Sequence, residues 1–199
     1  MGRRAVLVMA LATALAQSSC NSTPGRVTLE AKVSDLRRPS NSFGKNKAPD
    51  DLVKVTLPGR LLQPPAPVNL VRRTEADWST PERAMTSILS ANLAGDVSWM
   101  VENFVSAERE GVGKQLADPA AVRRIRDYYG NAGKVAITAS VEIRGFMVLF
   151  LLGLDDDGDA TFLNATLAKT PEGWKQTDAL AEDDTFDLVS AALHTAGAR

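Results

Sequence analysis

The sequence predicts an α+β domain in which three N-terminal helices pack on a curved, four-stranded antiparallel sheet, with one more helix at the C-terminus. Over residues 79–130, apolar side chains recur at helical spacing between capping residues, prolines and glycines. Over residues 134–180, the pattern changes to the alternation that is typical of strands and is interrupted by turn sequences. A helical pattern returns over residues 183–196 and predicts the closing helix.

Three short helices are predicted from their end signals. Thr80 is a good N-cap residue, proline follows it at the first helical position, and Gly95 can end the helix in the left-handed conformation. Asp96 can cap a second helix directly afterwards. Asp118 is again followed by proline, and Gly130 marks the end of the third helix.

Four strands are predicted after these helices. The first covers residues 134–143, and strict alternation would place these apolar residues on one face: Val135, Ile137, Ala139, Val141 and Ile143. The run FMVLFLLGL is apolar at nearly every position, so we expect a central strand whose two faces are both covered. ATFLNATLAK and WKQTDAL predict two further strands, with DDDGD and TPEG as turns.

The segment between the N-terminus and these elements has two interpretations. Residues 21–77 hold most of the prolines and a long polar stretch, a composition typical of a tether. Two short runs within it, RVTLEAKV and LVKVTL, alternate as strands do and could pair with each other or with the domain. The folded domain is therefore expected over residues 78–199, preceded by a tether that contains short strands at most.

The first residues have the pattern of an export signal. Arg3 and Arg4 precede an apolar run over residues 5–16, which is typical of a signal peptide. About a dozen helical residues rise about 18 Å, whereas a hydrocarbon core is about 30 Å thick. The sequence therefore predicts export and not a stable transmembrane helix.

Two cleavage sites are compatible with this signal. The small residues Ala14 and Ala16 would release a secreted or periplasmic chain that begins at Gln17. Ser18-Ser19-Cys20 instead resembles the end of a bacterial lipobox, with Gln17 where that family usually has an aliphatic residue. The lipoprotein resemblance implies a signal peptide over residues 1–20 and a lipid on Cys20 that attaches the chain to a membrane.

Lipidation also accounts for the single cysteine. An exported chain with one cysteine cannot form an internal disulfide, and a free thiol in an oxidising compartment needs an explanation. By the same resemblance, Asn21 in place of aspartate favours the outer membrane. The net charge of −1 gives no strong field that would attract nucleic acid, so no nucleic-acid partner is expected.

The order of elements over residues 78–180 resembles the nuclear transport factor 2-like superfamily of cone-shaped domains. The resemblance rests on TPERAMTSILSANLAGDVSWMVENF as a helix-Gly-Asp-helix unit and on a hairpin that reaches EGWKQTDAL. It is strongest to small bacterial lipoproteins related to the SnoaL-like proteins. It implies a pocket between the sheet and the helices, in which enzymes of the superfamily place an acid or a base, and it implies that a homodimer through the sheet is an option.

Seven residues are candidates for lining that pocket: Trp99, Phe104, Tyr129, Glu142, Arg144, Phe150 and Trp174. Glu142 and Arg144 would form an acid and its partner only if the sheet turned their face inward; a solvated face is the simpler expectation. His194 is the only histidine and is expected to be an ordinary side chain of the last helix. DDDGD lacks the spacing of a calcium loop, so no metal is predicted there. No catalytic residue and no cofactor is predicted either.

Three functions remain open from the sequence. The first is a non-catalytic envelope lipoprotein that contacts other envelope proteins. The second is a carrier or sensor that binds a small apolar ligand in the cone, and the third is an enzyme of the SnoaL type. A pocket filled by side chains would favour the first, and an empty cavity of a few hundred cubic ångströms would favour the second.

Overall fold

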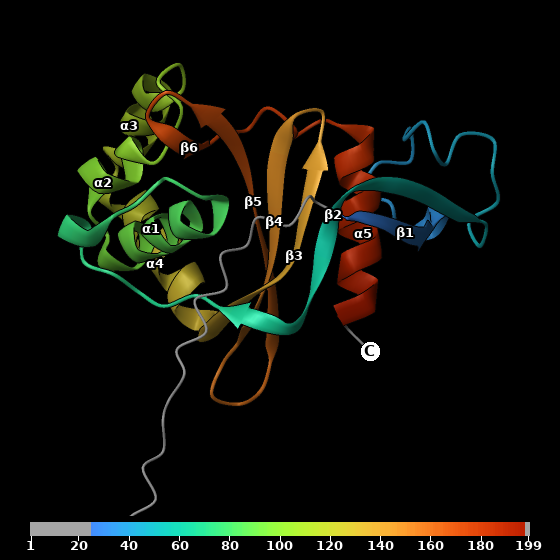
Figure 1. Cartoon of the computed structure of the whole chain (residues 1–199), viewed down its shortest axis with the longest axis horizontal. Helices are drawn as coiled ribbons and strands as arrows, with labels where there is room; N and C mark the ends of the chain where they lie inside the picture. The colour runs from blue at the N-terminus through green and yellow to red at the C-terminus, as the bar shows by residue number, and fades with distance from the viewer. Residues whose placement is uncertain (1–24, 198–199) are drawn as a thin grey trace, which may run out of the picture.

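The computed structural model describes residues 25–197, so the predicted export signal and Cys20 lie outside the described residues. Six strands form one antiparallel sheet in which each strand pairs with the next along the chain (Figure 1). The strands are β1 (Arg26–Lys32), β2 (Leu52–Pro67), β3 (Lys134–Ile143), β4 (Phe146–Leu154), β5 (Ala160–Thr170) and β6 (Gly173–Gln176).

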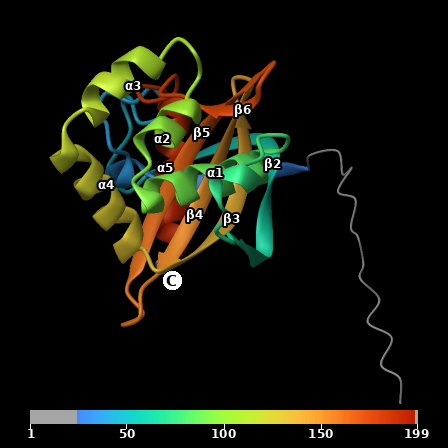
Figure 2. The ribbon, with the colours of Figure 1, turned by 90° about the vertical axis from the view of Figure 1, so that its left-hand side faces the viewer.

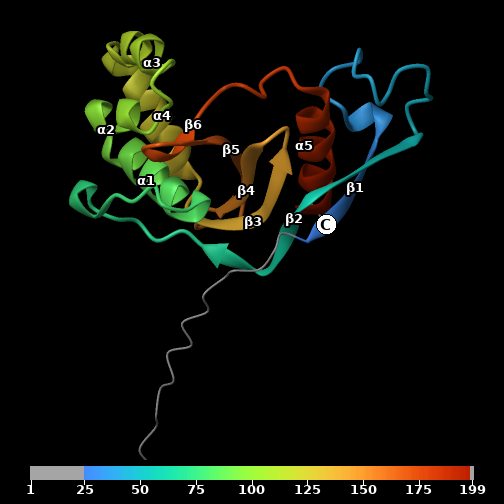
Figure 3. The same cartoon turned by 45° about the horizontal axis from the view of Figure 1, so that its top comes forward.

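Helices lie on both faces of this sheet. Four follow β2 and gather on one side, in front of the strands in Figure 2: α1 (Pro81–Ala94), α2 (Val97–Glu102), α3 (Arg109–Leu116) and α4 (Pro119–Asn131). The last helix, α5 (Asp184–Gly197), lies on the other side, next to β1 and β2 (Figure 3). Two short 3₁₀ helices, Val33–Asp35 and Arg73–Glu75, lie in the connections. Within residues 25–197, no helix is long and apolar enough to cross a membrane.

The predicted fold class is correct as α+β but wrong in its arrangement. The sheet has six strands instead of four, and β1 and β2 precede the helices, which number four before β3. The proline-rich segment can join the sheet because its prolines lie outside the paired stretches or at their ends, where Pro58 and Pro67 are the last paired residues. Leu61 pairs with Ala139 and Ala66 with Ile137, so Pro64 and Pro65 lie in an irregular stretch between these pairs, where their missing N–H groups leave no ladder bond unmade.

β2 changes its partner near its middle. Leu52–Pro58 pair with β1, and the strand then pairs with β3 from Gly59 onward. A Cβ atom at Gly59 would lie 2.6 Å from the Ser140 carbonyl oxygen, so only glycine allows the two backbones to approach this closely. This exchange explains how residues 26–67 extend the sheet instead of forming a tether.

β3 contains a bulge that overturns the predicted single apolar face. Ile137 pairs with Leu151 and Ala139 pairs with Phe150, so Thr138 is one residue in excess of the opposite strand. Val135 and Ile137 therefore point to the side of α1, whereas Ala139 and the apolar residues after it point to the side of α5. A one-residue insertion in a pattern of period two reverses the face of every later residue.

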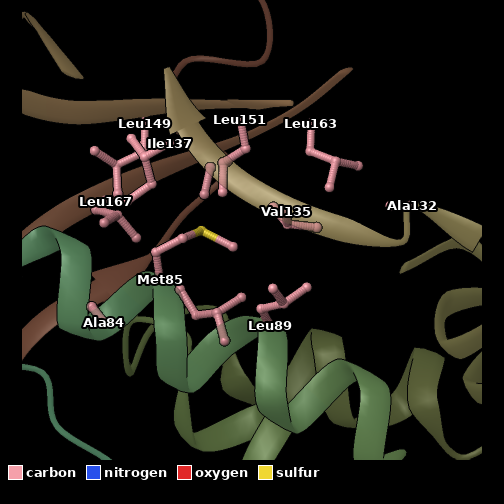
Figure 4. Packing of buried hydrophobic residues seen from close by; sticks show 12 residues of the cluster. Ala84, Met85, Leu89, Ala132, Val135, Ile137, Leu149, Leu151, Leu163 and Leu167 are labelled. Atoms are coloured by element: carbon pink, nitrogen blue, oxygen red, sulfur yellow. The ribbon is translucent and has the colours of Figure 1, made fainter. Parts of the chain in front are cut away.

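The two faces of the sheet form two separate cores. On the helix side, Met85, Ile88 and Leu89 of α1 pack against Leu149 and other leucines of β4 and β5 (Figure 4). On the opposite side, Leu29 and Ala31 of β1 pack with side chains of β3, β4 and α5. The prediction that residues 146–154 form a central strand covered on both faces is confirmed, because this strand contributes to both cores.

Candidate functional site

The space between α1 and the sheet, where the cone pocket was expected, is filled by side chains. Met85 and Leu89 of α1 point toward Leu149, Leu151 and Leu167 of the sheet (Figure 4), and each of the five is at most 2% exposed. Protein interiors of this kind are close-packed, and leucine and methionine fill them without polar groups. The helix side of the sheet is therefore a core.

A pocket of about 490 Å³ lies on the opposite side, between α5 and the sheet. α5 packs mainly against β1 and β2. Across the pocket, α5 faces β4 and β5 on the side of the sheet opposite α1. The pocket is lined by residues of α5, β3, β4 and β5 and by the segment that follows β1. We call it the α5 pocket.

Aromatic side chains form much of the α5 pocket. Phe150 of β4 and Phe186 of α5 are stacked, with ring centroids 6.3 Å apart and an interplanar angle of 24°. Phe162 of β5 lies against the imidazole of His194, with centroids 4.4 Å apart. Three of the six phenylalanines and the only histidine of the chain therefore meet in one pocket.

Two polar side chains in the pocket have hydrogen-bonding groups without a protein partner. Within residues 25–197, neither the hydroxyl of the half-buried Ser190 nor the side-chain amide of the exposed Asn164 makes a hydrogen bond with the protein, and both residues line the pocket. The hydroxyl of Thr138, at the β3 bulge, differs because it donates to the carbonyl oxygen of Phe150 at 3.2 Å. Ser190 and Asn164 can therefore bond a guest molecule.

A network of charged groups holds one wall of the pocket. The Asp187 carboxylate accepts hydrogen bonds from the backbone N–H groups of Arg37 and Arg38, at 2.9 and 3.3 Å, and from the Asn41 amide at 2.8 Å. The Arg38 Nε atom lies 3.8 Å from the same carboxylate, and the Asp187 side chain is only 2% exposed. These contacts fix the segment after β1 against α5, and they leave Asp187 engaged within the protein.

Asp184, one turn earlier on α5, takes part in the same network. The backbone N–H of Ser42 donates to its carboxylate at 2.8 Å, and this hydrogen bond, together with the nearby Arg38 guanidinium, holds the pKa of Asp184 below its ordinary value. The carboxylates at the start of α5 thus join residues 38–42 to this helix.

Of the seven side chains predicted to line a pocket, only Phe150 lines the α5 pocket, and it does so from the side opposite to the one expected. Trp99 is buried among the helices, and Phe104 forms a bridge with Gln176. Tyr129 and Trp174 pack against the core on the helix side. Burial raises the pKa of Tyr129, as expected for a phenol in a core.

Glu142 and Arg144 are not partners. Glu142 lies directly opposite Met147 on β4, and Met147 packs against the helix-side core, so Glu142 shares that face near the end of the sheet. Arg144, in the β3–β4 turn, instead forms an ion pair of 2.7 Å with Asp183, just before α5. Glu142 and Arg144 therefore do not form the acid and partner that a catalytic pocket would need.

One buried lysine was not foreseen. Lys175 of β6 is 2% exposed, its Nζ atom lies 3.7 Å from the centroid of the Trp78 ring, and it donates to the Glu102 carbonyl oxygen at 3.1 Å. Burial lowers the pKa of this amine. The contact joins β6 to α2, and the short sequence GWKQ gives no periodic signal that could have predicted it.

These features define an α+β domain with a packed core on each face of its sheet and an aromatic pocket between the sheet and its last helix. Within the described part of the chain, no cluster of three or more histidine, cysteine, aspartate or glutamate residues could hold a metal ion. No family model matches the sequence, and no curated protein matches it significantly.

Two solved structures are similar to parts of this chain. One, from Campylobacter jejuni, is named an NTF2-like transpeptidase; it is 14% identical, with a TM-score of 0.37, over 49% of this chain and 97% of its own. The other is a SEC-C motif containing protein from Rhodopseudomonas palustris, 16% identical with a TM-score of 0.35, over 49% of this chain and 75% of its own. Both TM-scores are low, so the functional argument below rests on this chain alone.

Proposed function

We propose that this domain is a non-catalytic ligand-binding domain, a carrier or sensor that holds a small and largely apolar molecule in the α5 pocket. The observation that carries the proposal is the pocket itself. Its volume of about 490 Å³ lies within the range of about 300–1,000 Å³ that is typical of ligand sites. Phe150, Phe162 and Phe186 give it aromatic walls, and eight of its fifteen lining residues are polar or charged.

We also propose that lipid on Cys20 attaches the protein to a bacterial membrane, with Asn21 favouring the outer membrane. β1 begins at Arg26, so five residues separate it from the cysteine. Five residues span at most about 18 Å when they are fully extended. The domain would then stay close to the bilayer, where apolar molecules accumulate.

The attachment is tested by the substitution Cys20→Ser in the native bacterium. We expect the wild-type protein to enter the detergent phase of a detergent-water partition and the variant to remain in the aqueous phase, because each buried methylene of an acyl chain contributes about 0.8 kcal/mol. Mass spectrometry of the mature chain provides the second readout. A wild-type chain that begins at Gln17 and carries no lipid would contradict the attachment.

The ligand-binding role is tested by filling the pocket. Ser190→Phe adds a ring where the hydroxyl now lies, and Ser106→Phe adds the same ring at an exposed position far from the pocket in the sequence. We expect native mass spectrometry of protein isolated from its own cells to show a small molecule on the wild type and on Ser106→Phe. We expect Ser190→Phe to lose it because the ring occupies its place.

The outcomes separate the remaining candidates. If the wild-type protein carries no small molecule but retains another protein chain, an interaction role is the better explanation. The edge of β1 favours that second candidate, since within residues 25–197 β1 pairs with β2 alone. An enzyme is the least supported, because the buried acid of the pocket, Asp187, is already engaged by four protein groups.

A further inference from the structure

We infer that the ligand of the α5 pocket is a flat, uncharged ring compound with at least one hydrogen-bonding group. This inference rests on the proposed function and narrows it from apolar molecules in general to one chemical class. It is argued from three properties of the pocket: the geometry of its aromatic side chains, the engagement of its charges, and its unpartnered polar groups.

The aromatic side chains favour a ring over an aliphatic chain. Phe150 and Phe186 present a stacked pair, and Phe162 is half-buried with the His194 ring tilted against it. A ring placed among them gains offset or edge contacts in addition to the area it buries. An aliphatic chain that buries the same area does not make these aromatic contacts. Each missing contact corresponds to an affinity about 2- to 10-fold lower.

The charges of the pocket disfavour a charged guest. The Asp187 carboxylate is engaged by two backbone N–H groups, the Asn41 amide and the Arg38 guanidinium. Arg37 donates to the Ala181 carbonyl oxygen at 2.7 Å, and it shares the rim of the pocket with Asp35, which has the opposite charge. Because Asp35 and Arg37 bring opposite charges to the same rim, they provide little net counter-charge for a guest ion, whose loss of hydration is costly.

The unpartnered polar groups provide orientation. Ser190 lies on α5 and Asn164 on β5, so they line the pocket from opposite walls. Asn164 is directly opposite Phe150 in the sheet, which places its amide next to the aromatic residues. A single hydroxyl or carbonyl on the ring can bond to one of these groups, and an apolar ring without such a group leaves both unused.

The inference is tested by nuclear magnetic resonance titration of the domain with naphthol, naphthoate and decanol. Naphthol is a flat, uncharged ring with one hydroxyl, naphthoate is the same ring with a charge, and decanol is an aliphatic chain with one hydroxyl. We expect naphthol to shift the amide signals of Asn164 and Ser190 and to bind at least tenfold more tightly than naphthoate. Decanol is expected to bind more weakly than naphthol.

The substitution Phe162→Leu separates ring recognition from burial. It keeps an apolar side chain at a partly exposed position, so the fold is expected to persist. We expect the affinity for naphthol to fall about 2- to 10-fold and the affinity for decanol to stay within about twofold. Binding of decanol or naphthoate as tightly as naphthol would overturn this inference and leave the proposed function intact, whereas failure of all three probes to reach the pocket would overturn both.

Discussion

Replacing Asp187 with alanine is expected to lower the free energy of unfolding by about 3–5 kcal/mol. The side chain is 2% exposed, and its carboxylate is the acceptor for two backbone N–H groups and the Asn41 amide. Its removal leaves the two backbone N–H groups and one Asn41 amide hydrogen without this acceptor, and it leaves the Arg38 guanidinium with Glu182 and Asp184 alone. Chemical denaturation followed by circular dichroism measures the change.

Glu182→Ala is the matched control for this substitution. Glu182 pairs with the same Arg38, at 3.1 Å, but its side chain is 86% exposed. Exposed pairs contribute about 0–1 kcal/mol, so the control is expected to change stability by no more than that. Equal losses from the two substitutions would contradict the account in which Asp187 anchors residues 37–41 to α5.

Replacing Leu149 with alanine is expected to cost about 2–5 kcal/mol. Leu149 is fully buried between α1 and the sheet, in the space where a cone pocket was expected. If this region is a close-packed core, the substitution leaves a cavity whose lining loses its contacts. Thermal and chemical denaturation of the variant measure the loss.

Leu154→Ala is the matched control on the same strand. This leucine ends β4 and is 45% exposed, so its truncation is expected to change stability by less than about 0.5 kcal/mol. A loss of less than about 1 kcal/mol for Leu149→Ala would show that the region under α1 is loosely packed. The helix side would then be a rival location for the ligand.

The helices could be predicted from the sequence because their signals are local. The Thr80 hydroxyl accepts from Arg83 N–H, Gly95 has a φ of 64°, and the carboxylates of Asp96 and Asp118 each cap the helix that follows. A cap and its helix lie within a few residues, so one short window contains the whole interaction. α3 (Arg109–Leu116) was not among the three predicted helices.

The arrangement of the sheet could not be predicted because it depends on distant partners. The bulge at Thr138 is defined only by pairing with β4, and the exchange at Gly59 only by pairing with β1 and then β3. Nothing in the alternating pattern of residues 135–143 marks one residue as extra. A prediction from period alone therefore places the later apolar residues on the wrong face.

The α5 pocket could not be predicted either, because its residues are brought together by distant parts of the chain. Phe150, Phe162 and Phe186 come from three elements and meet only after α5 crosses to the face opposite α1. Phe186, Val189 and Leu193 of α5 pack in or against the core on that face, and Val189 is fully buried. His194, expected to be an ordinary side chain of the last helix, is an exposed residue of α5 whose ring lies against Phe162 at the pocket.

A crystal structure of the protein purified from its own cells, with any retained molecule left in place, tests the central claim most directly. The account predicts electron density for a flat molecule among Phe150, Phe162 and Phe186, within hydrogen-bonding distance of Ser190 or Asn164. It also predicts close-packed side chains between α1 and the sheet. A molecule bound under α1, or an α5 that packs onto β4 and β5 and closes the pocket, would contradict it.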